Sequence, residues 1–175
     1  TPFLEIFPQT TTGNTKMYSI LILLLCFSFF NPFETNASVL RRFAFVIGAN
    51  KGGPQRATLQ YAISDARNFL DVLETMGGVQ KDDIILLENP TSKEMNQSLE
   101  KLKHLLASSY NAGRKEVIIY YSGHADESGI LLGEDRYSYR SLRTEIDQMG
   151  ADVNITVIDA CASGAITRLK GGSRT

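Results

Sequence analysis

The stretch "EVIIYYSGHAD", residues 116–126, combines an apolar run with a Ser-Gly turn and a histidine. The run lacks the regular alternation of polar and apolar residues that marks a half-buried strand. It is instead typical of a strand that is buried on both faces of a parallel sheet. The turn that follows the run carries His124. The stretch therefore predicts a buried strand that presents an imidazole at its carboxyl end.

Three other segments have the same apolar character: "FAFVIG" (43–48), "DIILL" (83–87) and "NITVID" (154–159). Helical patterns separate the runs. Parallel strands need long connections of this kind, usually with a right-handed crossover. The chain is therefore predicted to have an α/β fold, with a mostly parallel sheet flanked by helices.

Two of the predicted helices follow from the spacing of apolar residues. The first would bury a stripe that ends at Gly77-Gly78 and consists of Ala66, Phe69, Leu70, Leu73 and Met76. The second begins with the capping box "TSKE" (91–94) and would bury Met95, Leu99, Leu102 and Leu106. On this second helix, His104 falls on the solvated face.

The segment between the third and fourth runs predicts smaller elements. "SGILLGEDRYSY" (128–139) contains short strands bounded by glycines, which indicates a hairpin-like insertion. A helix is expected after it, near residues 142–149.

The amino-terminal part of the chain predicts a separate segment. "MYSILILLLCFSFF" (17–30) has the length of a signal-peptide core, so residues 17–37 are expected to be a signal peptide cleaved near Ala37. Residues 1–16 are then upstream translated sequence, and residues 38–175 form the functional domain. The predicted location is outside the cytoplasm, periplasmic or secreted. The alternative is an uncleaved membrane anchor, in which case only this segment would meet the membrane.

Charge and composition exclude several classes of function. The net charge is −1 and the acidic and basic residues are interspersed, so the chain has no basic face for nucleic acid. Its two cysteines and two histidines match no zinc-ligand spacing. We expect no nucleic-acid partner, no metal site and no cofactor.

The fourth run ends in "DACASG" (159–164), which places Cys161 just beyond a strand end, as His124 is. Loops at the carboxyl ends of neighbouring parallel strands converge, so the two side chains would meet if their strands are adjacent. A thiol with a pKa of about 8.5 is largely protonated at neutral pH, and an imidazole can accept its proton. The pair therefore predicts a nucleophilic cysteine with His124 as general base and later general acid.

Glycines flank both groups. Gly123 and Gly164 would let a substrate backbone approach, and the amides of Gly123 and Cys161 would donate to a developing oxyanion. Taken singly, Cys161 could be an inert buried thiol and His124 a turn residue.

The motifs "YYSGHAD" (120–126) and "DACASG" (159–164) resemble the histidine and cysteine motifs of the caspase-like cysteine peptidases. The resemblance covers roughly Phe43 to Gly164 and includes "LQYAISDA" (59–66). It implies a caspase-hemoglobinase fold and a Cys/His dyad that hydrolyses peptide bonds through an acyl-enzyme. The implied partners are protein or peptide substrates.

The aspartate at position 159, two residues before the cysteine, is a feature in which this sequence resembles the metacaspases, the paracaspases and their bacterial relatives. These peptidases cut after arginine or lysine. A carboxylate in the specificity pocket would attract a cationic side chain. Asp65 lies where the second pocket acid of this branch is expected. The alternatives are an acid favoured by the helix dipole for Asp65 and a strand-end cap for Asp159.

Other residues near the motifs have simpler interpretations. Asp126 could orient the imidazole, but a surface-loop role fits better. Ser163 could shape the pocket floor or only a turn. Tyr120 and Tyr121 are expected to be core and sheet-edge aromatics.

Domains of the resembling family continue beyond the cysteine with further strands, whereas this sequence ends at Thr175. The C-terminal strands are therefore expected to be missing, and the chain to be a fragment or a processed large subunit. Two alternatives to peptidase activity stay open: a catalytically inactive caspase-like binding or signalling domain, and a thiol phosphatase. The phosphatase is disfavoured, because six residues separate Cys161 from Arg168 where its phosphate loop has five. Calcium activation, found in part of the family, is not legible in this sequence.

Overall fold

The computed structural model describes residues 39–160. The predicted signal peptide and its cleavage point near Ala37 lie outside the described residues, as do Cys161, Ser163 and Gly164. No helix within residues 39–160 is long and apolar enough to cross a membrane.

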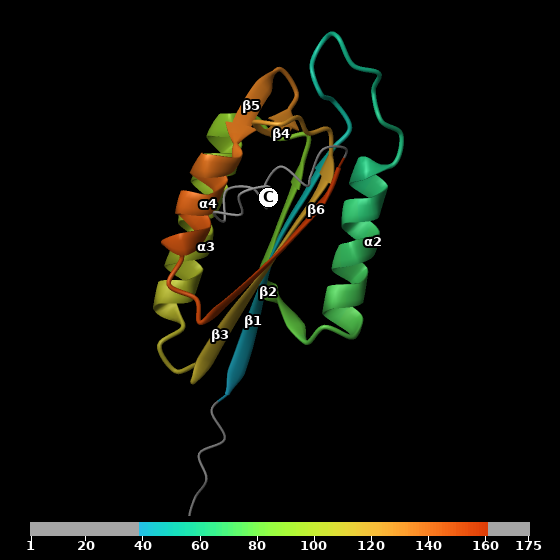
Figure 1. Cartoon of the computed structure of the whole chain (residues 1–175). Coiled ribbons are helices and arrows are strands. Elements are labelled where there is room, and N and C mark those ends of the chain that lie inside the picture. The colour runs from blue at the N-terminus through green and yellow to red at the C-terminus, as the bar shows by residue number, and fades with distance from the viewer. Residues whose placement is uncertain (1–38, 161–175) are drawn as a thin grey trace, which may run out of the picture. The chain divides into compact units, whose positions relative to one another are not determined.

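A parallel sheet forms the centre of the fold (Figure 1). In chain order the elements are β1 (Leu40–Ala49), α2 (Ala62–Thr75), β2 (Val79–Glu88), α3 (Ser92–Ser108), β3 (Arg114–Gly123), β4 (Gly129–Leu132), β5 (Asp135–Ser138), α4 (Tyr139–Asp147) and β6 (Val153–Asp159). The four long strands lie in the order β2-β1-β3-β6, and every pairing among them is parallel. The predicted α/β architecture is confirmed.

The register of the sheet brings the strand ends together. Ala49 at the end of β1 pairs with Gly123 at the end of β3. On the other side of β3, Ser122 pairs with Asp159 at the end of β6. β3 and β6 are thus adjacent, which was the condition for the histidine and cysteine motifs to share one sheet edge.

Helices cover both faces of the sheet, with α2 on one face and α3 and α4 on the other (Figure 1). The side chains of β1 show why its sequence has no alternation. Phe43, Phe45 and Ile47 pack in the core under α3 and α4, whereas Ala44 and Val46 pack against α2. Both faces of the strand are buried, so both sets of side chains are apolar.

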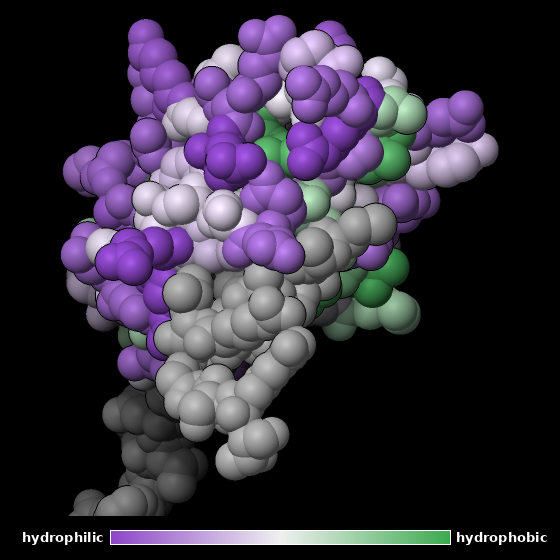
Figure 2. Space-filling view, turned by 45° about the horizontal axis from the view of Figure 1, so that its top comes forward, coloured by the Kyte–Doolittle hydropathy of each residue, from purple (hydrophilic) through white to green (hydrophobic). Residues whose placement is uncertain are grey.

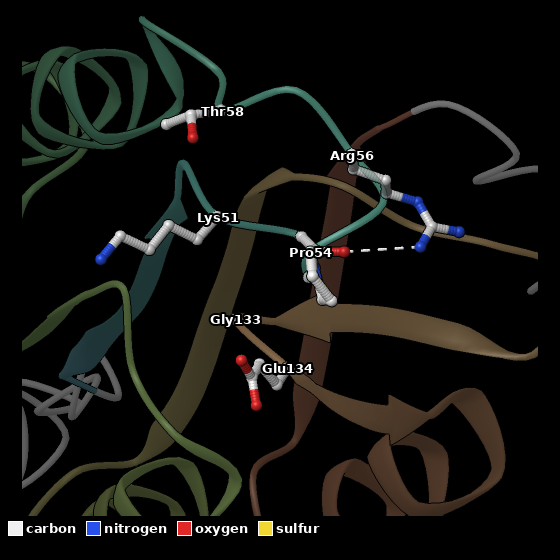
Figure 3. Close-up of a pocket in the computed structure, with 8 residues that line it drawn as sticks. Lys51, Pro54, Arg56, Thr58, Gly133 and Glu134 are labelled. Atoms are coloured by element: carbon white, nitrogen blue, oxygen red, sulfur yellow. Dashed lines mark hydrogen bonds between the residues drawn. The ribbon is translucent and has the colours of Figure 1, made fainter.

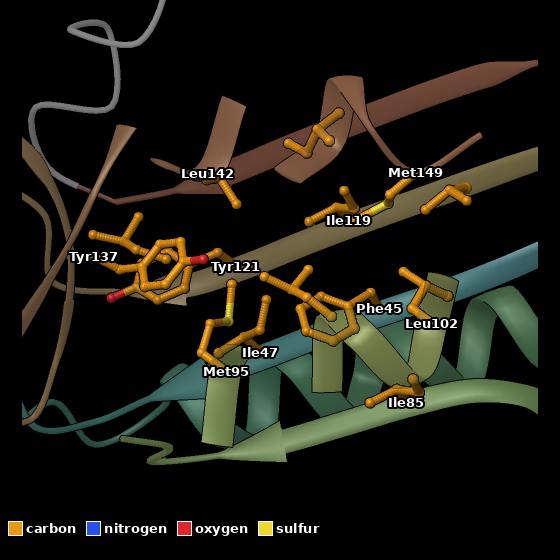
Figure 4. Close-up of a cluster of buried hydrophobic side chains, with 14 of the residues drawn as sticks. Phe45, Ile47, Ile85, Met95, Leu102, Ile119, Tyr121, Tyr137, Leu142 and Met149 are labelled. Carbon is orange, nitrogen blue, oxygen red and sulfur yellow. The ribbon is translucent and has the colours of Figure 1, made fainter. Parts of the chain in front are cut away.

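The larger core cluster lies between the sheet and α3 and α4 (Figure 4). It contains all four apolar residues of the stripe predicted for the second helix: Met95, Leu99, Leu102 and Leu106. The capping box is also present, since the Thr91 hydroxyl accepts from the Glu94 amide at 3.2 Å and Glu94 accepts from the Thr91 amide at 2.8 Å. His104 is exposed, as predicted.

The prediction that the apolar stripe of the first helix extends to Met76 is wrong. α2 buries Ala66, Leu70 and Leu73, but Met76 follows the last helical residue and is 79% exposed. Gly78, with φ of +69°, then turns the chain toward β2. Met76 itself already has non-helical backbone angles, with φ of −125° and ψ of −23°, so the helical spacing does not continue to this residue.

The insertion between β3 and β6 is an antiparallel hairpin of β4 and β5, as predicted. The helix after it begins earlier than expected, at Tyr139. Ser138 is its N-cap, and the Ser138 hydroxyl accepts from the Ser141 amide at 3.0 Å.

Candidate functional site

The candidate site lies at the carboxyl ends of β1, β3 and β6, where the loop of residues 50–61 also passes (Figure 1). Figure 2 turns this end of the molecule toward the viewer, and most of the described surface in that view is hydrophilic. In an open parallel sheet this edge is where ligands usually bind.

His124 follows β3 directly and is held by the 50–61 loop. Its Nε2 lies 2.8 Å from the carbonyl oxygen of Ala57. A carbonyl oxygen can only accept, so Nε2 carries the proton and donates. In the neutral ring Nδ1 is then unprotonated, so this nitrogen can accept a proton.

The backbone of Gly52 lies in close contact with the same imidazole. A Cβ atom at this position would collide with the His124 ring, coming within 2.6 Å of Cγ and 2.7 Å of Cβ. Only glycine fits this approach, so Gly52 and Ala57 together fix the ring from the same loop.

The backbone of His124 is held by two hydrogen bonds to its carbonyl oxygen. Its carbonyl oxygen accepts from the Tyr121 hydroxyl at 2.6 Å and from the Leu131 amide at 2.9 Å. The same hydroxyl lies 2.8 Å from the Leu131 carbonyl oxygen. Burial raises the pKa of the Tyr121 hydroxyl well above its ordinary value, so it remains a donor.

Gly123 is required by packing within the chain. A Cβ at this position would overlap the Tyr121 hydroxyl and lie 2.9 Å from the Ala49 carbonyl oxygen. The sequence predicted that this glycine opens the site to a substrate backbone. The structure gives a different reason, because the missing side chain makes room for Tyr121.

Asp126 does not hold the imidazole. Its carboxylate accepts from the amides of Ser128 and Gly129 and from the Arg136 guanidinium at 2.6 Å. Burial acts to raise the pKa of Asp126, but the Ser128 amide and the Arg136 guanidinium outweigh it, so the pKa is lowered. Asp126 thus stabilises the base of the β4–β5 hairpin, which agrees with the loop role predicted for it.

Asp65 and Asp159 line one cavity of about 450 Å³, here called the acidic pocket. Asp65 lies in the first turn of α2, and Asp159 is the last residue of β6. The other residues that line the pocket are Leu59, Gln60, Tyr61, Ala62, Ser122, Gly123 and Ala160. The structure thus brings together the two carboxylates that the sequence predicted as a pair. The pocket also reaches Gly123, the residue before His124.

A second cavity of about 320 Å³ lies on the other part of the 50–61 loop (Figure 3). Lys51, Arg56 and Glu134 line it, so it has no single sign of charge. Lys51 and Arg56 point in different directions, and the Arg56 guanidinium lies 3.4 Å from the Gly52 carbonyl oxygen (Figure 3). The acidic pocket is therefore the better match for a cationic ligand.

Two asparagines that the sequence did not single out hold the 50–61 loop in place. The Asn50 side-chain oxygen accepts from the Ile63 amide at 3.1 Å, and its carbonyl oxygen accepts from the Leu59 amide at 2.8 Å. The Asn50 amide in turn donates to the Asn89 side chain at 2.8 Å. Asn89 has φ of +45°, which asparagine tolerates better than most residues.

Backbone groups near His124 were also missed by the sequence. The Ala57 carbonyl is one of them, and the Ala125 amide is another. Among residues 39–160, the Ala125 amide has no hydrogen-bond acceptor. No side-chain signal marks either group, because every residue type carries the same backbone.

The described residues contain no group of three or more His, Asp or Glu side chains that could hold a metal ion. The predicted nucleophile Cys161 lies outside them, together with Ser163 and Gly164. The described part of the site thus consists of the imidazole, its backbone supports and the acidic pocket.

Comparison with known proteins gives a family match. A family model described as the caspase domain matches residues 41–175. Metacaspase-1 of Sclerotinia sclerotiorum is 30% identical over 111 residues, which cover 61% of this chain and 25% of that protein. Metacaspase-1 of Botryotinia fuckeliana is also 30% identical over 111 residues, covering 61% of this chain and 26% of that protein.

A more distant relative is metacaspase-1A of Aspergillus fumigatus, which is 25% identical over 119 residues. That alignment covers 66% of this chain and 28% of the relative. The matched part of the chain thus spans about a quarter of the length of these relatives.

Proposed function

This chain belongs to the caspase-domain family of cysteine peptidases, and we propose that it hydrolyses peptide bonds after arginine or lysine. The observation that carries the proposal is the acidic pocket, where Asp65 and Asp159 line one cavity beside the strand end that carries His124. The relatives' names support the same class of peptidase, because the three relatives reported above are all metacaspases.

The proposed chemistry uses the pair Cys161 and His124. With Nε2 bound to the Ala57 carbonyl, Nδ1 of His124 takes the proton of the Cys161 thiol. The thiolate attacks the substrate carbonyl carbon, and the resulting tetrahedral intermediate collapses as the imidazolium returns the proton to the leaving amine. Water, deprotonated by His124, then attacks the thioester, and collapse of the second intermediate releases the acid and restores the thiol.

The developing oxyanion needs backbone donors. The amides of Gly123 and Cys161 are the donors that the sequence predicts. We add the Ala125 amide as a candidate, because it follows His124 directly and is free of hydrogen bonds to the described residues.

The acidic pocket supports the preference for a basic residue before the cleaved bond. A charge-assisted hydrogen bond in a partly desolvated pocket contributes roughly 1.5 to 3 kcal/mol, or about tenfold to a hundredfold in discrimination. Two carboxylates can also engage the planar guanidinium fork at more than one point, so arginine is expected to exceed lysine. An acidic substrate residue is repelled.

The test compares cleavage of matched peptides that differ only in the residue before the cleaved bond: Arg, Lys, Ala or Asp. In the full-length protein, Asp159→Asn and Asp65→Asn should each lower kcat/KM for the Arg peptide by about tenfold or more. Asp71→Asn is the matched control, because Asp71 is an exposed acid of α2 outside the pocket. A preference for Asp, or an Arg preference that both pocket substitutions leave intact, would overturn the proposed specificity.

A further inference from the structure

We propose that Tyr120 is a positioning residue behind the acidic pocket, and that its hydroxyl, acting through Asp159, sets the preference for arginine over lysine. The inference rests on the proposed function, because it assigns a role within the same pocket. From its sequence context Tyr120 was expected to be only a core aromatic.

Packing fixes where the Tyr120 side chain lies. Its ring stacks on Phe69 of α2 with centroids 4.2 Å apart and an interplanar angle of 14°. The residue is 7% exposed and belongs to the core cluster under α2. A ring held this firmly delivers its hydroxyl to one place.

That place lies beside the Asp159 carboxylate of the acidic pocket. The Tyr120 hydroxyl is 3.4 Å from Oδ2 of Asp159. Burial raises the pKa of this hydroxyl and the negative charge of Asp159 raises it further, whereas a hydrogen bond from Ser122 acts to lower it. The pKa is raised on balance, so the hydroxyl stays protonated and donates to Asp159.

The position of the hydroxyl has a consequence for ligand choice. By donating to one oxygen of Asp159, the phenol restricts the rotation of that carboxylate and leaves its other lone pairs to a ligand. A guanidinium presents five donors in a rigid fork and needs acceptors at fixed positions, whereas an ammonium is a compact charge with three rotatable donors. Fixing the Asp159 carboxylate therefore favours arginine more than lysine.

The experiment removes only the hydroxyl. In the full-length protein, Tyr120→Phe keeps the ring on Phe69, and kcat/KM is measured on matched peptides with Arg or Lys before the cleaved bond. We expect the Arg-to-Lys ratio to fall about threefold to tenfold, the range for one lost hydrogen bond. The inhibition constant of agmatine, a small guanidinium compound, should rise by a similar factor.

Tyr121→Phe is the matched control, because it makes the same chemical change one residue along the strand, where the hydroxyl binds the His124 and Leu131 carbonyls instead. It should leave the Arg-to-Lys ratio unchanged even where kcat falls. Thermal melting checks that each variant folds.

The outcomes separate the two proposals. A wild-type protein without any preference for basic residues would overturn the proposed function. A wild-type preference for Arg whose ratio is unchanged in Tyr120→Phe would overturn the role of Tyr120 alone, as would an equal fall in Tyr121→Phe.

Discussion

His124 is fixed by groups that lie far from it in the sequence. The Ala57 carbonyl binds its Nε2, and Gly52 leaves no space for the ring to move toward the loop. The Tyr121 hydroxyl holds its backbone. An imidazole supported in this way keeps Nδ1 available in one orientation, which a general base requires.

The first prediction at this scale concerns the thiol of Cys161. A thiol-directed alkylating reagent should label Cys161 rapidly at neutral pH in the full-length protein, because His124 accepts its proton. In His124→Ala the thiol should revert toward an ordinary pKa of about 8.5, so labelling should slow about tenfold at pH 7 and recover at alkaline pH. The measurement is the labelling rate by mass spectrometry across pH.

His104→Ala is the control for that experiment, since His104 is an exposed residue of α3. Equal rates in wild type and His124→Ala at every pH would remove His124 from the mechanism. An unreactive Cys161 in a folded wild-type protein would favour the alternative of an inactive binding domain.

Among the elements, the 50–61 loop shows how a site is positioned without regular secondary structure. Asn50 bonds to Leu59 and Ile63, and so joins the end of β1 to the first turn of α2. The loop that it closes carries Ala57 toward His124 and leads into α2, whose first turn places Asp65 at the acidic pocket. Asn89 extends the same connection to the end of β2.

The second prediction concerns Asn89, which combines a side-chain acceptor with a left-handed backbone. Asn89→Gly removes the acceptor of the Asn50 amide, and should destabilise the fold by about 1 kcal/mol. Asn89→Ala removes the same acceptor and adds the strain of a positive φ, which costs about 1 kcal/mol more. Urea unfolding of the two variants measures the difference.

Catalytic activity should fall in the same order as stability, from wild type to Asn89→Gly to Asn89→Ala, because a loosened loop displaces the Ala57 carbonyl. If Asn89→Gly and Asn89→Ala have equal stability, the backbone at residue 89 is not strained. Asn96 is not a suitable control, since its side chain accepts from Tyr137. Asn111, which makes no side-chain hydrogen bond to the described residues, should tolerate Ala with little effect.

Comparison of the elements with the sequence shows which parts were predictable. Apolar runs and caps predicted β1, β3, β6 and α3, because burial and capping act on side chains that the sequence names. The pairing of Asp65 with Asp159 was predictable only through the family resemblance. The Ala57 carbonyl and the Asn50–Asn89 connection were not, since backbone acceptors carry no residue-specific signal and loop paths depend on tertiary contacts.

For the whole of the described domain, the two faces of the sheet are unequal. The cluster under α3 and α4 contains most of the large buried side chains, and the α2 side is smaller and includes Tyr120. The face with less core thus carries the acidic pocket, while the face with more core supports Tyr121 and, through it, His124. Rigid packing on one side and a cavity on the other suit a site that must hold a base and admit a substrate.

Export is a further prediction that concerns the whole chain. The apolar segment of residues 17–30 predicts a signal peptide, and cleavage near Ala37 stays a prediction. It implies that the processed protein begins close to β1, whose first residue is Leu40.

The last prediction tests the unequal cores by truncating one side chain on each side of the sheet. Leu102 of α3 is completely buried against the sheet, so Leu102→Ala should lower the free energy of unfolding by about 2 to 5 kcal/mol, through lost transfer energy and a residual cavity. Leu73 lies at the end of α2 and is slightly exposed, so Leu73→Ala should fall at the lower end of that range. Met76→Ala is the matched control, because Met76 follows α2 and is exposed, and its change should stay within about 0.5 kcal/mol. Urea unfolding of the three variants measures these differences. A large loss for Met76→Ala would restore the apolar stripe that the sequence predicted, and a small loss for Leu102→Ala would contradict the position of the main core beneath α3.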